Sequence, residues 1–123
     1  MQEIVTATAT LFRGEGILEE LSSVPPLKND VTLANTVASY VKDIVGEQSV
    51  ISFKGGGMGS EDFASYAYQV PSVYMMLGAG TKEENTLYGM PMHHPKVVFN
   101  EEILVTGAAI HAYSAIMWLK NNK

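Results

Sequence analysis

Two stretches of this sequence carry residue types that could do chemistry. The first, Gly55–Phe63, is rich in glycine and ends in Ser-Glu-Asp-Phe, and the second, Met92–Pro95, holds the one pair of adjacent histidines. Glycine lets a ligand approach the backbone closely, and a neutral imidazole is a common ligand of metal ions. A loop and a histidine turn of this kind are typical of the edge of an enzyme site.

The histidine pair has two interpretations. His93 could bind a metal ion, or it could be a surface histidine in a turn. Because adjacent residues of an extended chain point in opposite directions, we expect at most one of His93 and His94 to face a site. A catalytic zinc needs about three protein ligands, and this sequence has no cysteine and no His-x-Glu-x-x-His pattern to complete a set. His111 lies in the middle of a predicted helix, which favours a structural role.

The acidic pair that follows the glycines is also ambiguous. Glu61 and Asp62 could act as an acid or a base, or the backbone N–H groups near Ser60 could bind a substrate carboxylate. Capping of the following helix explains the same residues without a substrate. The glycine cluster is not a phosphate-binding loop, because no Gly-Lys-Ser/Thr follows it.

Composition limits the classes of protein. The chain has 123 residues, 46% of them hydrophobic and 17% charged, which is typical of one small globular domain. The net charge of −5 makes a nucleic-acid partner unexpected. We expect a cytoplasmic protein, because the start lacks the features of a signal peptide. The apolar run near the C-terminus contains His111, Tyr113 and Ser114, and its mixed composition argues against a membrane span.

The beginning of the chain predicts a strand followed by a connector. Residues 3–12 alternate and are rich in β-branched side chains, which indicates a strand. No hairpin partner follows it, so we expect its neighbours in missing sequence or in another subunit. Residues 13–30 contain Pro25-Pro26, which interrupts any helix.

The rest of the chain alternates between helices and strands. Helical spacing predicts a helix over 31–45, with Asn29 or Asp30 as N-cap and Gly46 after its end. Two further helices are predicted, one capped by Ser60 and reaching about Tyr68, the other capped by Asn100 and reaching Trp118 or Leu119. Strands are predicted over 49–53 and 72–77. This alternation predicts an α/β layered sheet.

The same motifs, taken together, resemble those of a known family. The matching blocks are Gly57-Met-Gly-Ser-Glu-Asp-Phe63, Val70-Pro71, Leu77-Gly-Ala-Gly80, Met92-His-His-Pro-Lys96 and Phe99-Asn-Glu-Glu102. Their order and spacing are similar to the C-terminal part of metal-dependent amidohydrolases. This group contains hippurate hydrolase, N-acyl-amino-acid amidohydrolase and indoleacetyl-amino-acid hydrolase, which are relatives of zinc carboxypeptidases.

The resemblance implies a fold and a division into domains. Residues 1–13 would be the last strand of a lid or dimerisation domain, 14–30 a linker, and 31–123 the C-terminal part of the catalytic domain. That part would form a partial three-layer α/β/α sandwich.

The resemblance also implies a site. His93 matches the C-terminal metal-binding histidine of the family, and Gly59, Ser60 and Glu61 match the turn near the substrate. The metal would be zinc, manganese, cobalt or nickel, and the reaction would be hydrolysis of the amide bond of N-acyl amino acids or small peptides. The other ligands and the glutamate that activates the water lie in the N-terminal half of the family, so no catalytic residue is expected in this chain.

Two functions therefore stand side by side. In the first, the chain is the C-terminal fragment of a hydrolase, inactive alone, and its partner is the missing N-terminal half, which could be encoded separately. In the second, it is a non-catalytic truncated paralogue that dimerises with a second copy through the strand at 3–12.

Overall fold

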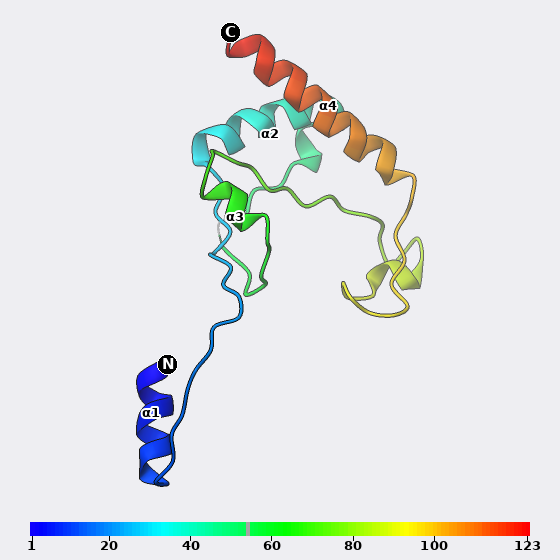
Figure 1. Cartoon of the computed structure of the whole chain (residues 1–123). Helices are drawn as coiled ribbons and strands as arrows, with labels where there is room; N and C mark the ends of the chain where they lie inside the picture. The colour runs from blue at the N-terminus through cyan, green and yellow to red at the C-terminus, as the bar shows by residue number, and fades with distance from the viewer. Residues whose placement is uncertain (54) are drawn as a thin grey trace.

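The fold is helical in the part of the chain that the structure describes. A computed structural model describes residues 1–53 and 55–123 (Figure 1). Its helices are α1 (Gln2–Leu11), α2 (Val31–Val45), α3 (Ala64–Ala67) and α4 (Ile103–Asn121), and its 3₁₀ turns are η1 (Glu47–Ser49) and η2 (Thr86–Gly89). Long irregular segments connect them.

The core lies where α4 crosses α2. Buried Val37 and Val41 of α2 pack with Ile110 of α4, and Leu33 and Ile44 lie against them. Two hydrogen bonds join the helices at the rim of this contact: the Tyr113 hydroxyl donates to Asp43 (3.1 Å), and the Asn121 amide donates to the Tyr40 hydroxyl (3.0 Å). Figure 1 shows this pair at one end of the molecule.

The predicted helix over 31–45 is confirmed to the residue. The Asp30 carboxylate accepts a hydrogen bond from the Leu33 N–H (2.7 Å), as an N-cap does, and Gly46 ends α2 with a φ of 82°. The predicted helix over 100–119 is also confirmed, with shifted ends. Asn100, the predicted N-cap, does not cap α4: its carboxamide accepts from the Glu102 N–H (3.0 Å), but α4 begins at Ile103 after Glu102, whose side chain makes no capping bond.

Helix α4 is long and apolar enough to cross a membrane by length and composition alone. The core helix of a soluble protein passes the same test. Here α4 buries Ile110 against α2.

The predicted α/β/α sandwich is wrong for this chain. Among residues 1–53 and 55–123 no strand is formed, so no sheet exists for the helices to cover. Residues 49–53 follow η1 without pairing, and residues 72–77 run as a stretched segment below the crossed helices (Figure 1). A strand needs a neighbour for its backbone N–H and C=O groups, and alternation along one segment does not supply that neighbour.

The predicted strand over 3–12 is also wrong, because residues 2–11 form α1. A helix pairs its backbone groups within the segment itself, which suits a segment without a partner strand. Side chains add local bonds, since the Thr10 hydroxyl donates to the Thr6 carbonyl oxygen (2.9 Å) and the Gln2 carboxamide accepts from the Leu18 N–H (2.9 Å). Helix α1 buries no residue and stands apart from the crossed pair (Figure 1). The domain boundaries at 13 and 30 stay predictions.

Candidate functional site

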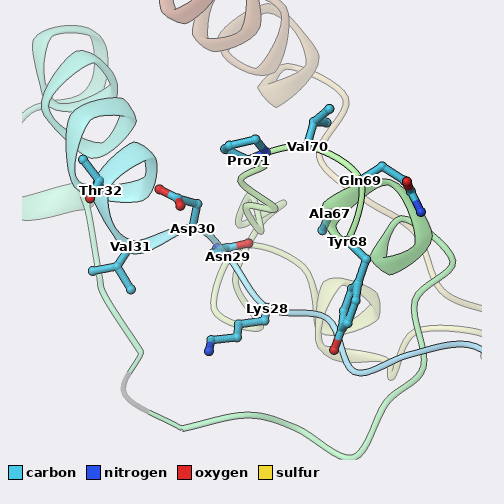
Figure 2. Close-up of a pocket in the computed structure, with 10 residues that line it drawn as sticks. All are labelled: Lys28, Asn29, Asp30, Val31, Thr32, Ala67, Tyr68, Gln69, Val70 and Pro71. Atoms are coloured by element: carbon cyan, nitrogen blue, oxygen red, sulfur yellow. The ribbon is translucent and has the colours of Figure 1, made fainter.

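An open hollow of about 500 Å³ separates the segment before α2 from the segment after α3. Figure 2 shows Lys28, Asn29 and Asp30 on the wall that leads into α2, and Tyr68 and Pro71 on the wall that follows α3. None of the four predicted site residues, Gly59, Ser60, Glu61 and His93, lines this hollow. It is therefore not the site that the sequence predicts.

Glu61 is the best-defined of the predicted substrate residues. One oxygen of its half-buried carboxylate accepts from the Phe63 backbone N–H (3.2 Å), and the other accepts from the Tyr74 hydroxyl (2.9 Å). The Phe63 ring lies 5.8 Å from the Tyr74 ring, so aromatic packing supports the same contact. Two residues from separate segments, Phe63 and Tyr74, thus fix the position of this carboxylate.

These hydrogen bonds favour the charged form of Glu61 over the neutral one. The bond from the Phe63 N–H, followed by the bond from Tyr74, holds the pKa of the Glu61 carboxyl below its ordinary value. The same carboxylate raises the pKa of the Tyr74 phenol, because the phenol must stay protonated to donate. At neutral pH the pair is an anion held by a neutral hydroxyl.

Asn29 holds the backbone of Tyr74 in place. Its carboxamide accepts from the Tyr74 N–H (2.8 Å) and donates to the Tyr74 carbonyl oxygen (2.9 Å). Next to it, the Asp30 N–H donates to the Ser72 carbonyl oxygen (3.0 Å). The segment that enters α2 therefore sets the position of the phenol that reaches Glu61.

Gly59 and Ser60 are exposed and precede this fixed carboxylate. Helix α3 begins only at Ala64, which is later than the predicted start at residue 60. Its shortness means that residues 59–61 lie in an irregular loop. The structure leaves the loop next to Glu61 open to solvent, and the substrate role of Gly59, Ser60 and Glu61 stays a prediction.

The two adjacent histidines differ in their surroundings. His94 is half-buried, and its Nδ1 accepts from the Lys96 backbone N–H (3.1 Å). His93 is exposed, has a φ of 69° and makes no hydrogen bond within the described residues. A positive φ is uncommon for a residue with a side chain and marks a position to consider for function. Of the two, only His93 has an imidazole without a hydrogen bond in the described chain.

The turn that carries His93 is held at the end of a long loop. The Asn100 N–H donates to the Ala79 carbonyl oxygen (2.9 Å) and closes the loop at its base. Within it, Gly80 has a φ of 114° and lies so close to the Tyr88 ring that any side chain at position 80 would overlap the ring. This contact requires glycine at position 80.

The described residues alone do not supply enough ligands to bind a metal ion. The described residues contain no group of three His, Cys, Asp or Glu side chains able to hold an ion. His93 would contribute one ligand, and a catalytic site needs about three. The metal role of His93 stays a prediction.

The sequence reasoning missed Asn29 and Tyr74 as partners of Glu61. The sequence predicted Asn29 only as a possible N-cap of the helix over 31–45, and it placed Tyr74 in a strand over 72–77. The contacts join residues 45 and 13 positions apart, and local pattern carries no signal for a contact at such separations.

Several characterised or named proteins are similar to this chain. It is 30% identical over 124 residues to the IAA-amino acid hydrolase ILR1-like 2 of Arabidopsis thaliana, which covers 98% of this chain and 27% of that protein. It is 33% identical over 94 residues to the putative amidohydrolase YhaA of Bacillus subtilis, covering 76% of this chain and 23% of YhaA. The N-acetylcysteine deacetylase of Bacillus subtilis is 26% identical over 123 residues, covering 100% of this chain and 30% of that protein. These names define a class, the hydrolases of amide bonds.

The family model of Peptidase family M20/M25/M40 matches residues 15–116. The chain therefore belongs to this family, and its relatives place it in the amidohydrolase group that the motifs predicted. It spans about a quarter of the length of the curated relatives it matches. No solved structure matches it.

Proposed function

We propose that this chain is the C-terminal part of a metal-dependent hydrolase that cleaves the amide bond of N-acyl amino acids or small peptides, and that it is inactive alone. Family membership supports the hydrolase class. The share of the relatives that the chain spans, about a quarter, supports the need for further polypeptide. The proposed partner is the polypeptide that supplies the rest of the hydrolase, and the cytoplasmic location stays a prediction.

One observation carries the proposal: His93 is exposed, and no other possible metal ligands are grouped with it in the described chain. His93 stands in a strained turn without a hydrogen-bonding partner in the described chain, and no second and third ligand accompany it there. His93 would then share an ion, of zinc, manganese, cobalt or nickel, with ligands on the other polypeptide. The general base of the reaction would come from there too, because this chain offers no residue that we assign to catalysis.

The loop at 59–61 is the part of this chain that would meet the substrate. Glu61 would enter the complex already ionised and oriented, since Phe63 and Tyr74 hold it in this form. Gly59 would let the substrate approach the backbone. The side chains that choose the acyl group and the amino acid would lie on both polypeptides.

The experiment uses a chimaera of the Arabidopsis relative, in which this chain replaces the matched quarter. The purified 123-residue chain with Zn²⁺, Mn²⁺, Co²⁺ or Ni²⁺ should not hydrolyse N-acyl amino acids or IAA-amino acid conjugates. The chimaera should hydrolyse the conjugates that the relative acts on, and His93→Ala should abolish this while His94→Ala keeps most of it. Hydrolysis by the isolated chain, or a chimaera indifferent to His93→Ala, would contradict the proposal.

A non-catalytic interaction module is the second candidate. The observation in its favour is the amount of exposed apolar surface, with Met76 at 84% and Phe53 at 81% exposure. Dimerisation through a strand at 3–12 is not part of it, because these residues are helical. An inactive chimaera together with tight binding of the chain to another polypeptide would favour this function.

A further inference from the structure

The stretched segment Ser72–Leu77 has one occupied edge and one free edge. On one side Ser72 and Tyr74 are paired through their backbone groups to Asp30 and Asn29. Along an extended chain the peptide groups of alternate residues point to opposite edges. The N–H and C=O groups of Val73 and Met75 therefore point away from Asn29, and they make no hydrogen bond to any residue that the structure describes.

An apolar groove of about 560 Å³ lies beside this free edge, between α2 and α4. Its walls are mostly apolar and include Leu33, Val37, Phe63, Val73, Trp118 and Leu119. The Ser114 hydroxyl oxygen also belongs to the groove, and it is buried without a hydrogen-bonding partner in the described chain. A buried hydroxyl without a partner is costly and is normally satisfied.

The amount of exposed surface indicates a large occupant. The chain exposes 10524 Å², whereas a compact monomer of its mass, 13.3 kDa, exposes about 6,500 Å². The excess, roughly 4,000 Å², has the scale of an obligate interface. The chain spans about a quarter of the length of its relatives, so the rest of such a hydrolase is large enough to cover this surface.

We propose that the free edge of Val73–Leu77 and the groove between α2 and α4 bind an extended apolar segment of the polypeptide that carries the rest of the hydrolase. The segment pairs its backbone with Val73 and Met75, and its side chains enter the groove. This inference rests on the proposed function, because the occupant is the partner proposed there. The pairing forms between two chains, by the mode in which a peptide adds to an exposed backbone edge.

The first test measures binding of this chain to the Arabidopsis relative shortened to the part outside the matched quarter. The two polypeptides are co-expressed and purified through a tag on the shortened relative. Met75→Pro removes a backbone N–H from the free edge and should weaken binding by about tenfold or more, equal to a loss of about 1.4 kcal/mol. Met76→Pro is the matched control, because its N–H points to the other edge, and it should change binding less than about threefold.

The second test fills the groove. Ala115 lines it, whereas Ala112 of the same helix does not. Ala115→Trp should weaken binding, and Ala112→Trp should not. Circular dichroism of all four variants checks that α2 and α4 remain helical, so that lost binding is not lost folding.

The combined results separate the proposed surface, its occupant and the proposed function. Selective loss with Met75→Pro and Ala115→Trp supports the proposed surface. Equal binding by both proline variants overturns the surface and leaves the proposed function standing, and so does an active chimaera whose separate pieces do not bind. Self-association of the chain alone that only Met75→Pro abolishes overturns the proposed occupant in favour of a second copy. An inactive chimaera together with no binding overturns both proposals.

Discussion

The crossed helices α2 and α4 and the region between them are built in different ways. The helices bury Val37, Val41 and Ile110 against one another, and α2 begins and ends at capping residues nearby in sequence. Residues 46–102 form only α3 and two 3₁₀ turns, and Ala64 is their one buried hydrophobic residue in the described chain. All the predicted site residues lie in this second region.

The difference shows that the helices and the site depend on different interactions. Burial of apolar side chains stabilises the crossed pair. A few side-chain bonds to backbone hold the site region, among them those of Asn29 to Tyr74 and of His94 to Lys96. Such bonds are worth about 1 kcal/mol each. The site region should therefore unfold at a lower denaturant concentration than the crossed helices.

The largest expected effect lies in the crossed pair. Ile110→Ala removes the buried side chain that α4 contributes to the core and should lower the free energy of unfolding by about 2–4 kcal/mol. Ile116→Ala on the same helix, at a position 51% exposed, should cost less than about 1 kcal/mol. Urea unfolding followed by circular dichroism measures both. Equal losses would show that the contact of α2 and α4 is not the core.

Gly80 tests the loop that carries His93. Gly80→Ala places a methyl group against the Tyr88 ring at a φ of 114° and should destabilise the loop by about 1–3 kcal/mol. Gly78→Ala has open space and ordinary φ, and should change little. Hydrogen exchange of residues 79–100 measures the difference. Faster exchange in α2 as well would show that the loop and the crossed helices do not unfold independently.

Asn29 tests the link between the regions. Asn29→Ala removes both hydrogen bonds to the Tyr74 backbone and should cost about 1 kcal/mol, at the low end for two bonds because they are exposed. Asn29→Asp keeps the acceptor for the Tyr74 N–H but places a carboxylate oxygen against the Tyr74 carbonyl oxygen, so it should not recover the lost stability. Hydrogen exchange at the Tyr74 amide reports the loss directly. An unchanged exchange rate in Asn29→Ala would mean that other contacts hold this segment.

The smallest expected effect is a shift of the Glu61 titration. Tyr74→Phe removes one of the bonds that lower the pKa of Glu61, so this pKa should rise toward its ordinary value. Because the folded-state pKa is lowered, the stabilisation by Glu61 is present above the unfolded pKa and is lost as pH falls through the folded one. The pKa of Tyr74 is raised in the folded state, so the stabilisation by the Tyr74 hydroxyl is lost at alkaline pH, as pH rises through that pKa.

Carboxyl chemical shifts followed by NMR over acidic pH measure the Glu61 change. Tyr66→Phe is the matched control, since Tyr66 also lies near the Phe63 ring, at 6.1 Å, and makes no side-chain bond to Glu61. A Glu61 pKa that does not respond to Tyr74→Phe would show that the Phe63 N–H and Asp62 lower it without Tyr74.

The sequence predicted what is local and missed what is long-range. Asp30 and Gly46 marked the ends of α2, because caps act on backbone groups within one turn, whereas Asn100 does not cap α4. The strands predicted over 49–53 and 72–77 did not form, because pairing needs a neighbour that periodicity cannot supply. The order of the motifs predicted the family, and the family model that matches residues 15–116 confirms this prediction.

Helix α1 is a second case in which a segment predicted as a strand has no partner strand. Alternation of β-branched residues over 3–12 indicates a strand only where a partner edge exists. Without one in the described chain, the segment satisfies its backbone as a helix and folds back on itself through Gln2 and Leu18. The contact between Glu61 and Tyr74 likewise could not be predicted from the local sequence pattern, because the two residues are 13 positions apart.

The metal content of the chimaera tests the account most directly. The purified chimaera is dialysed against Zn²⁺ or Mn²⁺, freed of unbound metal and analysed by inductively coupled plasma mass spectrometry. The account predicts that the chimaera retains metal, that His93→Ala loses bound metal, and that His94→Ala keeps it. Equal metal content in the chimaera and its His93→Ala variant would contradict the claim that this imidazole shares an ion with another polypeptide.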